Sequence, residues 1–287
     1  MTLYGVGLGP GDADLVTVRG RRVLEEADVV YSPGRLSRSV ATEHVPEARI
    51  GDVDFPMTRD EEELRRAWKA AAAEIAPRAR DGTAAFVTLG DPNVYSTFGH
   101  LRRTLAAFHP DVGVEVVPGV SAVTAFTTAL GVEIASGSSI ALREAARGAS
   151  PTGPDRMVLF KVTDVPVTHE GLVDAGYDVV YGRRLYMQQG ETVVTDDPEA
   201  LADRDYYTLA YAEKRGLDPR PATAAFDDGA ETESEPAAHT DGGVEPTAQT
   251  DWGAESTADA ATASDIASVE RAEGEACGDA VREGPSR

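Results

Sequence analysis

The chain has almost no cysteine and no long apolar run, and these absences exclude disulfide-bonded and membrane-spanning proteins. Its 287 residues include one cysteine, Cys277, so neither a disulfide framework nor a cysteine-based metal site can form. No apolar run approaches the length that spans a bilayer, and Met1 to Leu8 have no basic segment ahead of an apolar one. We therefore expect no membrane partner, no targeting segment and a cytoplasmic location.

Positive charge is scarce as well. The chain has three lysines, and its 27 Lys and Arg stand against 49 Asp and Glu, for a formal net charge of −22. The segment from Leu217 onward holds 17 acidic and 4 basic residues and so carries −13 of that charge. Such a field repels nucleic acid and anionic lipid, so we expect neither as a partner. An acidic, lysine-poor composition is typical of halophilic proteins, because salt screens the self-repulsion.

The histidines offer no metal site. None of the five has the spacing of a ligand pair, so we expect no metal centre. They are His44, His100, His109, His169 and His239.

One plan occurs three times in the first half of the chain: an apolar run, a Gly/Pro loop, and a stretch with helical spacing. The runs and loops are 3–8 with 9–12, 84–89 with 90–92, and 114–117 with 118–120. Continuous apolar strands alternating with helices predict an α/β domain whose parallel sheet is covered on both faces. Loops at the carboxyl ends of such strands meet at one edge, so we expect these three to line a single pocket.

The helical stretches carry their own signals. The first helical stretch should bury one apolar face, made by residues from Val16 to Ala27. A capping box, 58–61, predicts the start of a long helix with one apolar face. The helix over 121–130 should end at Gly131 in a left-handed cap.

The pattern changes beyond Gly137. Strand-like runs at 157–162, 177–181, 189–195 and 206–212 predict a smaller α+β domain. From Leu217 the sequence has almost no large apolar residues and cannot offset its ordering entropy. We therefore predict an α/β domain at 1–138, an α+β domain at 139–216 and a disordered acidic tail at 217–287.

The first loop, Gly5 to Asp12, does not fit a phosphate-binding pattern. Pro10 and Asp12 fall where a dinucleotide fingerprint needs its third glycine, and the Lys-Ser/Thr of a P-loop is missing. Simple structural roles are open for three polar residues: a helix-start carboxylate for Asp12, a turn for Asp91 and an N-cap for Ser121.

The loops together resemble the motifs of the tetrapyrrole methylases. Gly-Pro-Gly-Asp at 9–12, Gly-Asp-Pro at 90–92 and Pro-Gly-Val-Ser at 118–121 follow in the family's order. Tyr-Ser-Thr-Phe at 95–98 and the run 55–60, Phe-Pro-Met-Thr-Arg-Asp, resemble the branch that methylates C20 of precorrin-2 or cobalt-factor II. The resemblance covers residues 3 to about 130.

The resemblance implies the tetrapyrrole methylase fold, with S-adenosylmethionine in a cleft between two domains. It places the cofactor contacts at Pro10, Leu89, Gly90, Asp91, Val94, Ser121 and Ala122, and less strongly at Lys161 and Met187. Asp12 and Tyr95 are the candidates for contact with the macrocycle. Methyl transfer mainly requires alignment of the reacting atoms, so no catalytic acid or base is identified.

The implied activity is methylation of C20 of a small-molecule tetrapyrrole, with cobalt-factor II favoured over precorrin-2, by a chain that forms a homodimer. Uroporphyrinogen methyltransferases of the family carry an Asp in the stretch after the second strand. Here that stretch, 31–35, is Tyr-Ser-Pro-Gly-Arg, which argues against their activity. Two alternatives stay open: a protein methyltransferase similar to diphthine synthase, and a non-catalytic tetrapyrrole-binding module.

Overall fold

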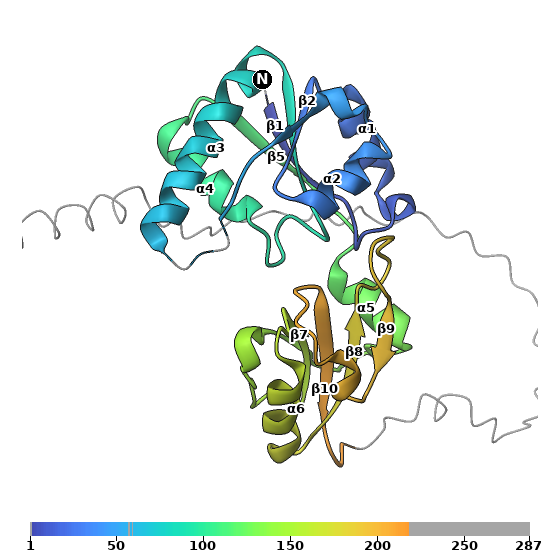
Figure 1. Cartoon of the computed structure of the whole chain (residues 1–287). Helices are drawn as coiled ribbons and strands as arrows, with labels where there is room; N and C mark the ends of the chain where they lie inside the picture. The colour runs from blue at the N-terminus through green and yellow to red at the C-terminus, as the bar shows by residue number, and fades with distance from the viewer. Residues whose placement is uncertain (1, 57, 59, 218–287) are drawn as a thin grey trace, which may run out of the picture. The chain divides into compact units, whose positions relative to one another are not determined.

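The computed structural model describes residues 2–56, 58 and 60–217, and the structural statements below concern these residues (Figure 1). Apart from Leu217, the predicted tail 217–287 lies outside them, so its disorder stays a prediction. His239, Met57 and Arg59 lie outside them too.

The first sheet has five strands in the order β3-β2-β4-β1-β5, and every neighbouring pair is parallel. Its strands are β1 (Thr2–Gly7), β2 (Val29–Ser32), β3 (Ile50–Asp52), β4 (Thr83–Thr88) and β5 (Gly113–Val117). Its helices are α1 (Val18–Glu26), α2 (Arg35–Thr42), α3 (Glu61–Asp81) and α4 (Phe98–Phe108), with short 3-10 helices at Ala13–Leu15 and Glu47–Arg49. The predicted parallel α/β sheet is confirmed.

Helices cover both faces of this sheet, as the unbroken apolar strands predicted. Alternate side chains of a strand point to opposite faces, so Leu3 packs with the buried residues of α3 and α4, whereas Val6 packs with those of α1 and α2. Figure 1 shows the two pairs of helices on opposite sides of the sheet. The first half of the chain therefore has two apolar layers, one on each face.

The buried face of α1 and the start of α3 can both be compared with the predictions. In α1 the expected buried face is confirmed at Gly20, Val23 and Leu24. The predicted capping box at 58–61 was wrong. The helix α3 begins at Glu61, and its N-cap is Asp60. The Asp60 carboxylate accepts hydrogen bonds from the amides of the second and third helical residues. A carboxylate at the positive helix end is a better cap than a hydroxyl, and the Thr58 hydroxyl instead accepts the amide of Asp60.

The second sheet is mixed, with the order β6-β7-β10-β8-β9. Only β6 and β7 are parallel among its described pairs. Its strands are β6 (Ala141–Glu144), β7 (Arg156–Phe160), β8 (Tyr177–Arg183), β9 (Val193–Thr195) and β10 (Thr208–Lys214). The helix α6 (Val165–Asp174) and short 3-10 helices at Ala146–Gly148 and Glu199–Leu201 accompany it. The predicted strand at 189–195 is shorter in the structure: β9 begins at Val193, and the residues before it form a loop.

The helix α5 (Ala122–Leu130) begins at Ser121 and ends at a left-handed Gly131, as predicted. Its buried residues Val123 and Phe126 pack with residues of β7 and β10, so the helix covers the second sheet (Figure 1). The third strand-loop-helix unit thus differs from the first two, which cover the parallel sheet. The predicted domain boundary near residue 138 stays a prediction.

Candidate functional site

The three Gly/Pro loops meet at the carboxyl edge of the parallel sheet, as expected. Gly9 and Gly90 form a two-way backbone bridge, with N···O distances of 3.3 and 2.6 Å. The third loop joins through the amide of Gly119, which donates to Oδ2 of Asp91 at 3.1 Å. Both Gly9 and Gly90 have left-handed backbones (φ 73° and 69°), which explains the glycines at these positions.

A hollow of about 670 Å³, partly open to solvent, lies beside these loops; we call it the main hollow. From the loops and the start of α5, its lining residues are Pro10, Leu89, Gly90, Asp91, Val94, Tyr95, Ser121 and Ala122. The structure therefore brings together all seven residues that the resemblance assigns to the cofactor, and also Tyr95.

The other lining residues come from strands of the second sheet and from loops next to them. They are Phe160, Lys161, Met187, Tyr206, Tyr207 and Leu209. Lys161 and Met187 were implied by the resemblance, but the other four were not predicted. One signal was present in the sequence: two adjacent tyrosines just before a strand, in a chain with only 6% aromatic residues.

The polar loop side chains hold the loops in shape. Asp91 accepts from the amide of Asn93 through Oδ1, at 2.8 Å, and from Gly119 through Oδ2. Ser121 caps α5 by accepting from the amide of Val123 at 3.2 Å. The turn and N-cap roles thus exist for Asp91 and Ser121, and cofactor binding by these side chains stays a prediction.

The two candidates for macrocycle contact are placed differently. The Asp12 carboxylate accepts from the amide of Asp14 at 2.9 Å, and Asp12 does not line the main hollow. Tyr95 does line it, with a left-handed backbone (φ 47°) and its ring 4.7 Å from that of Phe160. Such a backbone is costly for a tyrosine and is typical of functional sites. Their contact with a substrate stays a prediction.

Charges in the main hollow are few. Lys161 Nζ lies 3.5 Å from a carboxylate oxygen of Glu144 and 5.6 Å from the Tyr206 ring centre. Burial lowers the pKa of Lys161, but the neighbouring Tyr206 and Glu144 raise it by more, so the amine stays protonated at neutral pH. Burial also raises the pKa of Tyr207, whose hydroxyl stays neutral. The walls are thus mainly aromatic and apolar, with backbone polar groups along the loops.

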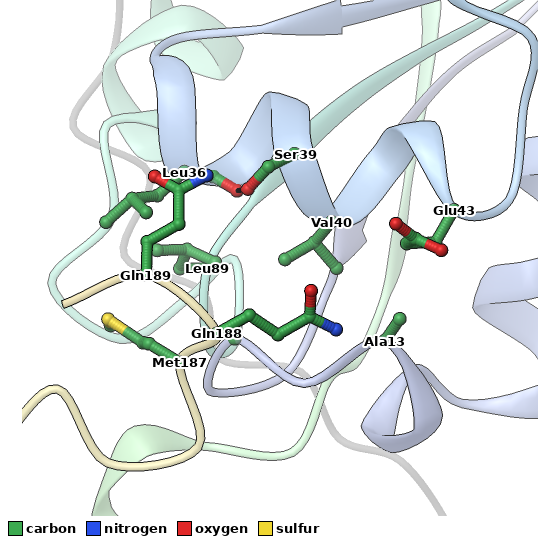
Figure 2. Close-up of a pocket in the computed structure, with 10 residues that line it drawn as sticks. Ala13, Leu36, Ser39, Val40, Glu43, Leu89, Met187, Gln188 and Gln189 are labelled. Atoms are coloured by element: carbon green, nitrogen blue, oxygen red, sulfur yellow. Dashed lines mark hydrogen bonds between the residues drawn. The ribbon is translucent and has the colours of Figure 1, made fainter. Parts of the chain in front are cut away.

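A second hollow of about 330 Å³, the side hollow, adjoins the first and shares Leu89 and Met187 with it. Its other lining residues are Gly11, Ala13, Leu36, Ser39, Val40, Glu43, Gln188 and Gln189. Figure 2 shows Gln188 and Gln189 extending from the loop that follows β8 toward the face of α2. This loop therefore borders both hollows.

The remaining groups do not form a metal site or a membrane span in the part of the chain that the structure describes. There, no three His, Cys, Asp or Glu side chains are grouped to hold a metal ion. None of the described helices is both long and apolar enough to cross a bilayer. His100 has a structural partner, since its ring stacks on Trp68 with centroids 4.1 Å apart.

Comparison with known proteins gives a consistent result. The model of the family Tetrapyrrole (Corrin/Porphyrin) Methylases matches residues 2–202. A protein of Methanocaldococcus jannaschii named "Probable cobalt-precorrin-2 C(20)-methyltransferase" is 34% identical over 141 residues, 47% of this chain and 60% of that protein. The precorrin-4 C(11)-methyltransferase of Pseudomonas aeruginosa is 32% identical over 158 residues, 53% of this chain and 58% of that protein. The chain thus spans about 60% of these relatives.

Solved structures share the fold. The uroporphyrin-III C-methyl transferase of Thermus thermophilus, complexed with S-adenosylhomocysteine, has a TM-score of 0.55 at 21% identity and covers 74% of this chain and 97% of its own. A cobalt precorrin-4 methyltransferase gives 0.57 at 23% identity, covering 74% and 94%. At these identities the likeness shows the fold alone.

Proposed function

Because the chain belongs to the tetrapyrrole (corrin/porphyrin) methylases, we propose that it transfers a methyl group from S-adenosylmethionine to C20 of a cobalamin precursor. Cobalt-factor II is the favoured acceptor and precorrin-2 the alternative. The observation that carries the proposal is the main hollow, where the seven residues that the resemblance assigns to the cofactor lie together.

The donor set of the main hollow suits this cofactor, which has an amino-acid end, an adenine and a cationic sulfonium but no phosphate. Leu89, Gly90 and Asp91 bring the main chain of one loop to the hollow, and the Gly90 amide and carbonyl hold that loop to Gly9. The aromatic residues Phe160, Tyr206 and Tyr207 also line the hollow and offer apolar ring surface for the adenine. No phosphate-binding pattern is needed, which agrees with the loop sequence.

The residues of the chain act by holding and orienting the two reactants. When bound, S-adenosylmethionine supplies an electrophilic methyl group, and the acceptor supplies an electron-rich carbon. The loops hold the cofactor, which is one of the two reactants, and the apolar walls exclude water that would compete for the methyl group. Tyr95 and Tyr206 line the hollow yet stay 44% and 42% exposed, so two aromatic side chains remain free to meet a flat macrocycle.

Two observations bear on the choice of acceptor. The relatives compared above include C20 and C11 methyltransferases at similar identity, so the position of methylation is a proposal. The stretch 31–35, at the end of β2, has no Asp, whereas uroporphyrinogen methyltransferases carry one in this stretch; the buried Ser32 hydroxyl binds the Gly34 carbonyl and Ser37. That stretch supports a cobalamin precursor over uroporphyrinogen as the substrate.

The test is an incubation with S-adenosylmethionine labelled in its methyl carbon, at high salt, with cobalt-factor II, precorrin-2 and a precorrin-4-type acceptor in parallel. We expect mass spectrometry to show a gain of one methyl group on one of the first two acceptors, and carbon NMR to place it at C20. Methylation only of the precorrin-4-type acceptor would replace C20 by C11. No gain on any acceptor would support the non-catalytic alternative.

The resemblance is also the basis for proposing a homodimer. Light scattering should then give twice the mass of the chain, and the mass of a single chain would contradict it.

A further inference from the structure

The Arg184 side chain lies between two segments that line the hollows. It belongs to the loop after β8, and its Nε lies 2.6 Å from Oδ2 of Asp205. Its Nη1 donates to the backbone carbonyl of Gln189 at 3.1 Å, which closes the loop on itself. One planar guanidinium thus serves two acceptors in different segments, a task that suits arginine.

The contacts continue beyond this ion pair. Asp205 Oδ1 accepts from the amide of Tyr207 at 2.8 Å, and the amide of Arg184 donates to the carbonyl of Tyr207 at 3.1 Å. The guanidinium lies 5.7 Å from the Tyr207 ring. The Arg184 and Asp205 side chains are 27% and 12% exposed, so water screens the pair only partly. The ion pair, the bond from the Arg184 amide and the ring contact tie the Arg184 loop to the segment 205–207, and the bond from the Tyr207 amide to Asp205 fixes the shape of that segment.

The backbone of the loop is strained where the pair holds it. Arg184 and Tyr186 both have left-handed backbones, at φ 52° and 60°. Such conformations persist in non-glycine residues when surrounding contacts determine them. Gly190 leaves the space for the guanidinium, because a Cβ there would lie 2.6 Å from Arg184 Cδ and 2.7 Å from Nη1. The loop shape and the arginine therefore depend on each other.

Both ends of the ion pair lie next to residues that line the hollows. The Arg184 loop carries Met187, which borders both hollows, and then Gln188 and Gln189 of the side hollow (Figure 2). Tyr206 and Tyr207 of the main hollow directly follow Asp205. Neither Arg184 nor Asp205 lines a hollow itself.

We propose that Arg184 and Asp205 form a positioning pair, which holds Met187 and Tyr207 in the arrangement that binds the cofactor and keeps the shared wall of the two hollows in place. This inference rests on the main hollow being the cofactor site. It is independent of which acceptor carbon is methylated.

The test compares the affinity for S-adenosylhomocysteine, measured by calorimetry on the full chain, with thermal stability. R184M removes the charge and the planar fork, and D205N removes the charge while keeping the side-chain volume. We expect each to weaken binding roughly tenfold or more, because without the charge-assisted hydrogen bond Met187 and Tyr207 lose the contacts that hold them in place. R184K, which keeps the charge but loses the fork, should bind with intermediate affinity.

A matched control is the Arg156–Glu213 ion pair, between β7 and β10. Its N···O distance is 2.8 Å and its side chains are 23% and 35% exposed, but neither residue lines a hollow. R156M should lower thermal stability about as much as R184M and leave the affinity unchanged. If R156M and R184M weaken binding equally, or if R184M and D205N both bind within twofold of wild type, the pair is merely structural and the proposal is wrong.

One further variant separates this inference from its premise. A122F fills the main hollow and should abolish binding of S-adenosylhomocysteine. Unchanged binding by A122F would show that the cofactor lies elsewhere, which would overturn both the site and the positioning pair. The acceptor experiment under the proposed function is unaffected by that result, so the two failures are distinguishable. If R184M does not fold, D205N and R184K decide the question.

Discussion

Replacing Gly7 by alanine tests whether close backbone contact between the three loops builds the site. Gly7 ends β1 and is buried. A Cβ there would lie 2.6 Å from both N and Cα of Gly119 and 2.6 Å from the carbonyl oxygen of Gly90. Ordinary contact begins at 3.4 Å, so the loops would have to separate by about 0.8 Å.

The magnitude follows from this overlap. Inserting one methyl group into a packed site costs about 1–3 kcal/mol. For a folded body of about 200 residues, each kcal/mol lowers the midpoint of thermal unfolding by roughly 2–4 °C, so we expect a fall of roughly 2–12 °C. The backbone of Gly7 is not left-handed, so the effect is steric. Because the displaced loops carry Gly90 and Asp91, which line the main hollow, the affinity for S-adenosylhomocysteine should fall roughly tenfold or more.

The measurements are thermal unfolding followed by circular dichroism and binding followed by calorimetry. The matched control is G34A, since a Cβ at Gly34 meets no atom within 4 Å and its backbone is extended. G34A should behave like wild type in both measurements. If G7A is as stable as G34A and binds equally well, the loops are not held by backbone contact, and the reasoning fails.

Three further predictions concern other parts of the chain. D91N leaves one loop amide without its acceptor, so chemical denaturation should show a loss of roughly 1–3 kcal/mol; an unchanged value would contradict the role of Asp91 as a tie to Gly119. The hydrogen bond from Arg80 holds the pKa of Asp111 at about 2, so its stabilising effect should be full above about pH 4 and be lost as pH falls toward 2. D111N should remove that part of the acid sensitivity in pH-dependent unfolding, and an identical profile would refute it. Deleting residues 218–287 should leave cofactor affinity unchanged, because the part of the chain that the structure describes lines both hollows by itself; a loss of binding would show that the tail contributes.

Local signals in the sequence predicted one side of the site well. A Gly or Pro after an apolar strand specifies a turn at a known edge of a parallel sheet, so the loops around Pro10, Gly90 and Gly119 could be placed without any long-range contact. The left-handed end of α5 at Gly131 followed from the same kind of local rule.

The other side of the site depends on long-range pairing. Strand β10, the last strand of the described residues, lies between β7 and β8, and no local pattern specifies that order. Tyr206 and Tyr207 reach the main hollow because of this arrangement. The sequence likewise gave no sign that α5 would pack on the second sheet, because its apolar face suits either sheet.

The packing of α5 has a consequence for how the folded chain comes apart. The helix starts at Ser121 and Ala122, beside the loops of the first sheet, and buries Phe126 against β7 and β10. Val94, from the loop after β4, belongs to the same apolar cluster. Among the described residues, Val94 is the one member of this cluster that precedes α5, so the helix should lose its structure together with the second sheet. A ligand bound against both the loops and the start of α5 would link the two sheets and raise the resistance of each to heat and proteases.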